Sequence, residues 1–433
     1  MKYLLDLIYI FAAAGYSPVI VYRRLKYRRY QKGWSNRFGR ITRKHPQKKC
    51  IWIHAVSVGE VNATRTIVGE LSKKCSQYEI LITTTTDTGF ARANALYGSQ
   101  FQVCYFPLDF SWIMRRVFSA IRPVICILME LEVWPNFAQT AGEMNVPIVV
   151  ANGRVTERSM KRYNIVRPFV KKMFENVFCI LAQTEQYADR FRKLGCSAEK
   201  VIVTGSLKYD TAQIADKVEG SDTLSKELNI GSKRLWVAGG TGNAEEEIIL
   251  DVYKTLQKQQ ELADVRLAII PRKPERFDEV ATVIKDKGFE LIRYSQVKSK
   301  SSTNNIKENA VILGDTMGDL RKFYSLATVI FVGRSLVPMG GSDMMEAAAL
   351  GKCTILGPHT FNFQQTVDAL LAGNGVILVN NAYELFEAVQ KSLLDDNFRK
   401  QTAKNGQQII RKNQGATQKT LYHILKLLNN RTS

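Results

Sequence analysis

Residues 51–60 read IWIHAVSVGE, an apolar run that changes abruptly into a polar turn. The first six residues are typical of a buried parallel strand, and VNATRTIVGEL after Glu60 has helical character. The same unit recurs along the first half of the chain. The further strand-like runs are ILITTT (80–85), FQVCYF (101–106), VICILM (124–129), PIVVAN (147–152), VFCILA (177–182) and KVIVTG (200–205). This alternation predicts an α/β fold with a doubly wound parallel sheet.

A second series of strand-like runs begins at residue 235. Its members are LWVAGG (235–240), RLAIIP (266–271), AVILGD (310–315), ATVIFVG (327–333), CTILGP (353–358) and GVILVN (375–380). The polar stretch 216–233 before them is interpreted as a linker near residue 220, and 295–309 as a polar loop. Residues 382–428 have helical character and are candidates to pack back across the domain junction.

Two successive α/β domains follow from this pattern. We expect an N-terminal anchor with its basic flank at 1–30, one Rossmann-like domain at 31–214 and a second at 215–433. Ligands of such sheets bind outside the carboxyl ends of the strands. Two facing sheets would therefore place the active site in the cleft between the domains.

The N-terminus predicts contact with a membrane. Residues 3–22 are a mostly apolar run, roughly 30 Å long as a helix. Residues 23–49 then hold twelve Lys or Arg and no acid, which favours an anionic membrane surface and keeps this end cytoplasmic. Asp6, Ser17 and Pro18 leave two readings open, a spanning helix and an amphipathic helix lying in the interface. A cleaved signal peptide is disfavoured because only Lys2 precedes the apolar run.

Composition narrows the possible functions of the 433 residues. The net charge of +21 suits an anionic partner, but no zinc-finger spacing, RNP-like motif or basic zipper points to nucleic acid. The seven cysteines form no CxxC pair and are interpreted as buried free thiols. The four histidines are scattered, so no metal site is predicted.

Candidate chemical groups follow the strands of the first domain. Ser57 and Glu60 have the spacing of a capping box, but a carboxylate at a helix N-terminus also stays ionised and can act as a base of depressed pKa. Glu130, Glu132 and Trp134 follow another strand and can hold a sugar or form surface ion pairs around a turn. Lys208 follows a third strand, where a solvated lysine is the alternative.

Gly-rich turns and cations follow the strands of the second domain. Arg272 and Lys273 come directly after a strand, and residues 316–319 and 333–343 lead from strands into helices. Glycine lets backbone N–H groups approach an anion, and the helix N-terminus favours negative charge. Several such turns in one domain predict nucleotide binding.

Eight blocks together make the chain resemble the 3-deoxy-D-manno-octulosonic acid (Kdo) transferases of lipopolysaccharide biosynthesis. They are HAVSVGE (54–60), MELEVWPN (129–136), ANGRVTERS (151–159), TGSLKYD (204–210), PRKPERF (271–277), LGDTMGDL (313–320), FVGRSLVPMGG (331–341) and LGPHTFNF (356–363). The resemblance implies a two-domain GT-B glycosyltransferase that moves Kdo from CMP-Kdo to a lipid A precursor (lipid IVA), with inversion and without metal or cofactor. It also implies work at the cytoplasmic face of the cell inner membrane.

The resemblance also implies roles for individual residues. Glu60 takes the position of the general base, and Glu130 and Lys208 take those of transition-state stabilisers. The residues at the family's CMP-binding positions are Pro271, Arg272, Met317, Gly318, Asp319, Asp343, Met344, Met345 and Glu346.

The chain departs from the family pattern in its donor half. Lys273 replaces a usual His, Ser342 and Asp343 stand in place of His-Asn, and Ala347 replaces a Pro. The loop GGTGNAEEE (239–247) lacks the usual His. Two other functions stay open from the sequence: a GT-B transferase of another nucleotide sugar, and a non-catalytic membrane-bound scaffold.

Overall fold

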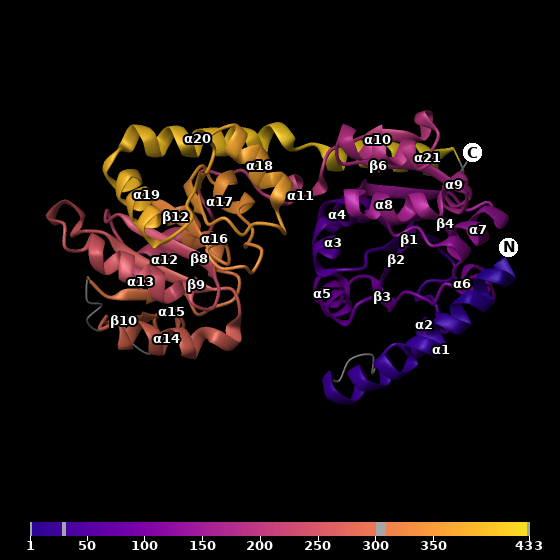
Figure 1. The fold of residues 1–433 in the computed structure, drawn as a ribbon, viewed down its shortest axis with the longest axis horizontal. Coiled ribbons are helices and arrows are strands. Elements are labelled where there is room, and N and C mark those ends of the chain that lie inside the picture. The colour runs from indigo at the N-terminus through magenta and orange to yellow at the C-terminus, as the bar shows by residue number, and fades with distance from the viewer. Residues whose placement is uncertain (1, 28–31, 300–308, 431–433) are drawn as a thin grey trace. The chain divides into compact units, whose positions relative to one another are not determined.

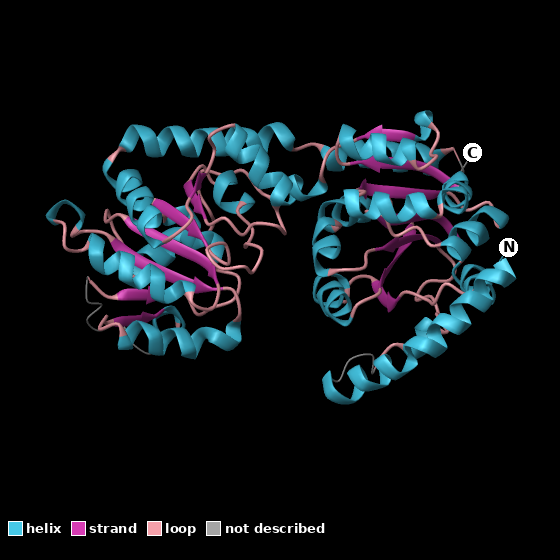
Figure 2. Ribbon diagram, in the orientation of Figure 1, coloured by secondary structure: helices cyan, strands magenta, loops and turns pink. Residues whose placement is uncertain are grey.

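A computed structural model describes residues 2–27, 32–299 and 309–430 and shows two α/β units (Figures 1 and 2). Unit 1 runs to Thr211 and includes the chain from Gln414 onward, and unit 2 is Ala212–Asn413. Each unit holds a seven-stranded parallel sheet with helices on both faces. The prediction of two doubly wound Rossmann-like domains is confirmed.

The sheet of unit 1 has the strand order β3-β2-β1-β4-β5-β6-β7. The strands are β1 Lys49–His54, β2 Tyr78–Thr84, β3 Gln102–Tyr105, β4 Pro123–Met129, β5 Ile148–Gly153, β6 Val177–Ala182 and β7 Val201–Val203. The helices are α1 Lys2–Tyr27, α2 Trp34–Arg37, α3 Val58–Ala63, α4 Arg65–Lys74, α5 Asp87–Tyr97, α6 Ser111–Ile121, α7 Pro135–Glu143, α8 Glu157–Ile165, α9 Arg167–Glu175, α10 Glu185–Lys193, α11 Leu207–Thr211 and α21 Ala416–Asn429.

Both faces of this sheet are buried, which explains the continuous apolar strands. On one face Trp52 packs against Phe118 of α6 and Phe137 of α7, with ring centroids 5.3 and 5.1 Å apart. The other face packs against α4 and α21, which contributes Leu421 and Ile424. Helix α21 (yellow in Figure 1) therefore completes the core of unit 1, whereas residues 414–433 were expected in the second domain.

The sheet of unit 2 has the order β10-β11-β9-β8-β12-β13-β14. The strands are β8 Leu235–Thr241, β9 Arg266–Pro271, β10 Leu291–Arg293, β11 Val311–Leu313, β12 Val329–Val332, β13 Cys353–Leu356 and β14 Ile377–Leu378. The helices are α12 Ser221–Glu227, α13 Glu245–Leu256, α14 Phe277–Asp286, α15 Tyr294–Lys298, α16 Leu320–Leu326, α17 Met345–Ala349, α18 Gln364–Ala372, α19 Ala382–Leu394 and α20 Asp396–Asn413.

Two features of unit 2 differ from the sequence analysis. The stretch expected to be a linker contains α12, and its Leu224, with Leu228 just after it, is fully buried. The prediction was wrong because one apolar face of a short helix is enough to anchor an otherwise polar segment. The edge strand β10 was missed because three half-buried residues give too short a pattern to recognise.

Helix α1 is attached to unit 1 by a polar cluster. The carboxylate of Asp6 accepts hydrogen bonds from the Ser111 backbone N–H (2.9 Å) and from Asn136 Nδ2 (3.0 Å), and Tyr9 donates to Asp109 (3.2 Å). Many apolar side chains of α1 are exposed, among them Phe11 at 68%. None of the helices in the described residues combines the length and the apolar character needed to cross a membrane.

All seven cysteines are buried free thiols, as the sequence analysis predicted. Burial raises the pKa of Cys50 to about 12, and the other buried thiols shift in the same direction. They act as small apolar core residues.

Candidate functional site

Glu60 lies at the carboxyl edge of the sheet of unit 1, in the first turn of α3. Ser57 caps this helix, and the Glu60 carboxylate accepts from the Ser57 N–H (3.2 Å), the Ser57 hydroxyl (2.8 Å) and the Val56 N–H (3.0 Å). The capping box is therefore formed. An ionised carboxylate has about four acceptor sites, so these three donors leave one of them free to accept a substrate proton.

The Glu60 carboxylate is only 8% exposed, and burial raises its pKa despite the bonds from Val56 and Ser57. The negative charge of Glu130 raises it further. The expectation of a depressed pKa was wrong because α3 has only six residues and a weak dipole, whereas desolvation acts on the whole carboxylate. A raised pKa makes Glu60 a stronger base than the sequence indicated.

Glu130 and Lys208 come together beside Glu60. Glu130 follows β4 with a φ of +57°, the left-handed conformation, and its N–H donates to the Ala151 carbonyl (2.9 Å). Its carboxylate lies 4.0 Å from the Lys208 ammonium. Lys208 is positioned by α11, whose first N–H, that of Leu207, donates to the Asn152 side chain (3.0 Å). The structure thus brings all three predicted catalytic residues to one edge of one unit.

Glu132 is a third carboxylate in this cluster. Burial and the charge of Glu60 raise its pKa to about 7, against a hydrogen bond from Trp134 that lowers it. Glu132 in turn contributes, after burial, to the raised pKa of Tyr163 on α8. From the sequence, Glu132 was expected only to contact a sugar or to form a surface ion pair. Nothing in its position along the chain predicts that it lies buried near Glu60.

A second site lies at the carboxyl edge of unit 2. The order in which the chain adds strands to this sheet reverses between β8 and β12. The carboxyl ends of β8, β9 and β12 surround a cavity of about 360 Å³. Such a switch point is where doubly wound sheets bind ligands. The lining residues are Thr241, Gly242, Asn243, Arg272, Lys273, Arg276, Glu279, Arg334 and Met339.

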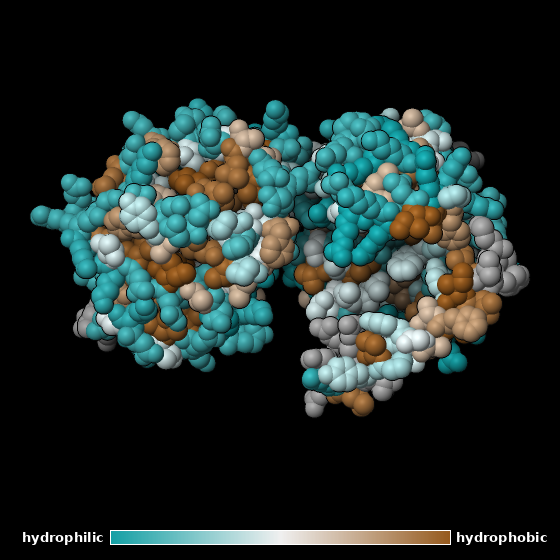
Figure 3. Space-filling view, in the orientation of Figure 1, coloured by the Kyte–Doolittle hydropathy of each residue, from teal (hydrophilic) through white to brown (hydrophobic). Residues whose placement is uncertain are grey.

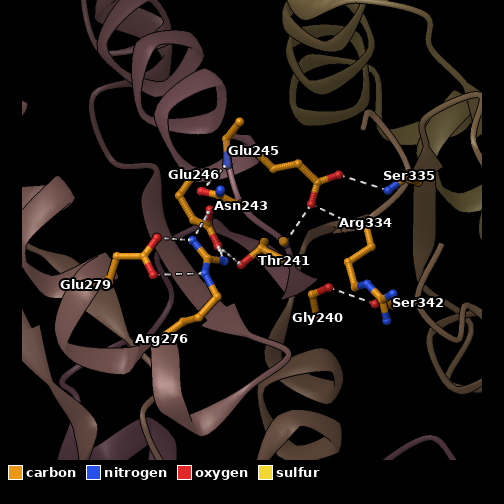
Figure 4. A network of polar contacts seen from close by, with 12 residues as sticks. Gly240, Thr241, Asn243, Glu245, Glu246, Arg276, Glu279, Arg334, Ser335 and Ser342 are labelled. Atoms are coloured by element: carbon orange, nitrogen blue, oxygen red, sulfur yellow. Dashed lines mark hydrogen bonds and ion pairs between the residues drawn. The ribbon is translucent and has the colours of Figure 1, made fainter. Parts of the chain in front are cut away.

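Glu245 holds the walls of this cavity together (Figure 4). Its fully buried carboxylate accepts from the N–H groups of Gly242 (2.8 Å), Ser335 (2.8 Å), Leu336 (3.0 Å) and Arg334. Burial raises its pKa and the four backbone donors oppose that shift. The side chain therefore joins the turn after β8 to the turn after β12.

Glu246 performs a similar task on the other side of the cavity. It accepts from the Thr241 hydroxyl (2.7 Å) and binds the Arg276 guanidinium through both oxygens (2.7 and 3.1 Å). Arg276 also pairs with Glu279 (2.8 Å). Neither role was expected from the sequence, since consecutive glutamates usually mark only the solvated first turn of a helix.

The predicted nucleotide residues fall around the same edge. Arg272 lines the cavity, while Pro271 ends β9 in the buried sheet. Met317 is 69% exposed, and Gly318 takes a φ of +94° that glycine alone adopts freely. Asp319 is buried, and its bonds from Lys298 and Lys322 lower its pKa to about 2 against the desolvation that would raise it.

The other predicted residues surround the start of α17. The side chains of Met344 and Met345 lie in the core, so only their backbone is available to a ligand. Asp343 is exposed and Glu346 half-buried, and both charges act on the buried hydroxyl of Tyr324. Burial is the largest cause of the raised pKa of Tyr324, and the charge of Arg272 opposes the rise.

The departure at Ser342 is structural. Its hydroxyl donates to the Gly240 carbonyl (2.7 Å) and its N–H to the Gly333 carbonyl (3.0 Å). Figure 4 shows this bond between Gly240, near the end of β8, and the loop before α17. Within the described residues, no group of three His, Cys, Asp or Glu has the arrangement of a metal site.

Two Rossmann-like units, each with a doubly wound parallel sheet, have the architecture of the GT-B fold. A solved UDP-GlcNAc 2-epimerase from Neisseria meningitidis shares the fold, with a TM-score of 0.56 at 15% identity over 87% of this chain and 100% of that one.

Sequence comparison identifies the family. A family model described as 3-deoxy-D-manno-octulosonic-acid transferase (kdotransferase) matches residues 32–211. A 3-deoxy-D-manno-octulosonic acid transferase of Haemophilus influenzae is 35% identical over 382 residues, 87% of this chain and 86% of that protein. One of Bordetella pertussis is 32% identical over 392 residues, 84% and 86% of the two chains. The chain belongs to the 3-deoxy-D-manno-octulosonic acid transferase family.

Proposed function

We propose that the chain transfers Kdo from CMP-Kdo to a lipid A precursor, with inversion at the anomeric carbon. The observation that carries the proposal is the cluster of Glu60, Glu130 and Lys208 at the carboxyl edge of unit 1. A buried carboxylate whose pKa is raised by burial and by the charge of Glu130 suits the transfer of a proton from a neutral sugar hydroxyl. Family membership supplies the choice of sugar.

The proposed reaction is a single displacement. The acceptor hydroxyl oxygen forms a bond to the anomeric carbon of Kdo while Glu60 takes its proton. The bond from that carbon to the phosphate oxygen of CMP breaks, and its electron pair leaves with CMP. Attack from the face opposite CMP inverts the centre, and a single base is enough.

Charged groups stabilise the two ends of this transition state. The ring becomes positively charged as CMP leaves, and the Glu130 carboxylate is suited to stabilise that charge. Lys208 is proposed to stabilise negative charge in the transition state, and Arg272 is suited to bind the phosphate of CMP. The CMP moiety is proposed to contact Pro271, Met317, Gly318, Asp319 and the residues from Asp343 to Glu346.

Product analysis tests the activity. Purified protein with CMP-Kdo and lipid IVA is expected to give, by mass spectrometry, a lipid heavier by one or more Kdo residues. UDP- and ADP-linked sugars, offered at the same concentration, are expected to give no product. Transfer from one of those donors instead would support a GT-B enzyme of different specificity, and the absence of any transfer would favour a scaffold.

The proposal includes work at the cytoplasmic face of the inner membrane. Leu7 and Phe11 lie one turn apart on α1 and are 50% and 68% exposed, and apolar and pale side chains line this helix in Figure 3. Asp6 and Tyr9 hold the same helix against unit 1. A helix attached in this way is suited to lie in the interface with its exposed face in the lipid.

Charge on that face is expected to release the protein from membranes. In the double variant Leu7→Glu with Phe11→Glu, we expect the membrane-bound fraction to fall at least about tenfold, because burying each carboxylate in lipid costs more than the apolar contact it replaces. Sedimentation with vesicles of acidic phospholipid measures it. Phe361→Glu, on a residue 60% exposed in unit 2, is the matched control. Equal binding of the double variant and the control would contradict the role of α1.

A further inference from the structure

The cavity of unit 2 carries more positive charge than its own acids neutralise. Arg272, Lys273, Arg276 and Arg334 line it, against Glu279 as its one acidic lining residue. The charge of Arg276 is neutralised, since its guanidinium pairs with Glu279 (2.8 Å) and with the buried Glu246 (2.7 Å). Within the described residues, the side chains of the other three cations form no ion pair with a carboxylate.

Two of these cations are adjacent in the chain and available to a ligand. Arg334 donates to the Met339 carbonyl (3.0 Å). The side chains of Arg272 and Lys273 are exposed, and across residues 2–27, 32–299 and 309–430 neither makes a hydrogen bond or ion pair. Two neighbouring uncompensated cations suit a ligand with two anionic groups close together.

The two cations face different surroundings. The backbone N–H of Arg272 donates to the Thr241 carbonyl (3.1 Å), which holds Arg272 against the end of β8. Lys273 has extended backbone, with φ −117° and ψ 128°, ahead of the short helical turn Pro274–Arg276. The following proline restricts Lys273 to this extended conformation. The lysine side chain is exposed and lines the cavity.

We infer that Lys273 binds the carboxylate of the donor's sugar, while Arg272 binds the phosphate. This inference rests on the proposed function and deepens it. In CMP-Kdo the carboxylate and the phosphate oxygen are attached to the same carbon, so two adjacent cations match them. The site thereby selects nucleotide-activated sugars that carry a carboxylate on the anomeric carbon, and a neutral sugar leaves Lys273 without a partner.

The variant Lys273→Met tests the inference, because it removes the charge and keeps the apolar stem. We expect KM for CMP-Kdo to rise about 10–100-fold, the value of one charged hydrogen bond, with kcat changed less than about threefold. The Kd for CMP, measured by titration calorimetry, is expected to stay within about twofold. Arg272→Met is expected to weaken both CMP and CMP-Kdo, because the phosphate is common to them.

Controls separate the possible outcomes. Lys273→Arg keeps the charge and is expected to restore KM to within about threefold, and Lys285→Met, on the exposed face of α14, is expected to change nothing. If Lys273→Met weakens CMP as much as CMP-Kdo, the lysine binds phosphate and the inference is overturned. Unchanged KM also overturns it. A wild-type protein that binds CMP but transfers no Kdo contradicts the proposed function instead.

Discussion

Glu60→Gln is expected to reduce Kdo transfer by roughly 10²–10⁴-fold while the protein stays folded. The glutamine keeps the shape of the side chain and still serves as a capping-box residue. One of the two N–H donors, from Val56 or Ser57, then faces an amide NH₂ group, which costs about 0.5–2 kcal/mol of stability. The amide cannot accept the proton of the acceptor hydroxyl. Initial rates and thermal unfolding measure the two effects separately.

The matched control is Glu70→Gln on α4, a partly exposed glutamate that pairs with Lys73 and Lys74 of its own helix. It is expected to leave both rate and stability nearly unchanged. A Glu60→Gln protein that keeps more than about a tenth of the wild-type turnover would exclude Glu60 as the base. Glu132, whose pKa of about 7 also suits a base, would then be tested next.

The pH dependence gives a second readout for the same residue. Glu60 acts as a base only when ionised, and burial with the charge of Glu130 raises its pKa. Wild-type kcat is therefore expected to fall on acidification at a pH above the ordinary glutamate value of about 4.3. If the acidic limb of the pH–rate profile lies at or below a pH of about 4.3, the reacting base is more solvated than Glu60.

The sequence predicted the architecture well because buried parallel strands leave a strong signal. Thirteen apolar runs correspond to strands β1–β9 and β11–β14, each bounded by a turn at its carboxyl end. The short strand β10 and helix α12 could not be predicted in this way, since each buries only a few side chains and leaves too short an apolar pattern. The return of α21 to unit 1 depends on its fit against α4, which no local pattern encodes.

The candidate residues were found from spacing and resemblance, but their electrostatics were not. The spacing correctly predicted that Ser57 and Glu60 form a capping box, but the same reasoning gave the wrong direction for the pKa of Glu60. The direction depends on desolvation and on Glu130, which is 70 positions away in the chain and close in space. Glu132 was underestimated for the same reason, because its raised pKa arises from burial beside Glu60.

Glu245→Ala is expected to have the largest effect on stability among single substitutions in the donor half. It removes the acceptor for the N–H groups of Gly242, Arg334, Ser335 and Leu336, in a site without solvent exposure. Each orphaned donor costs about 1–3 kcal/mol, and water entering the truncated site recovers part of that. We therefore expect unit 2 to lose about 3–5 kcal/mol.

Three measurements follow from this geometry. Trp236 is the one tryptophan of unit 2, so the change in its environment during urea unfolding reports on this unit. Hydrogen exchange in residues 333–337 is expected to accelerate, because the Glu245 carboxylate anchors three of those amides. CMP binding is expected to weaken at least about tenfold, since Gly242 and Arg334 line the cavity and both lose their anchor.

The adjacent Glu247 provides the matched control, because it is exposed in the same turn of α13. Glu247→Ala is expected to change stability by less than about 0.5 kcal/mol. The stability of Glu245→Gln is expected to lie between those of Glu245→Ala and Glu247→Ala. Its one carbonyl oxygen can accept from two of the four N–H donors, while its NH₂ group faces the others. If Glu245→Ala unfolds at the same urea concentration as Glu247→Ala, the four bonds do not hold the cavity. Other contacts, among them the bond from Ser342 to the Gly240 carbonyl near the end of β8, would then hold this region.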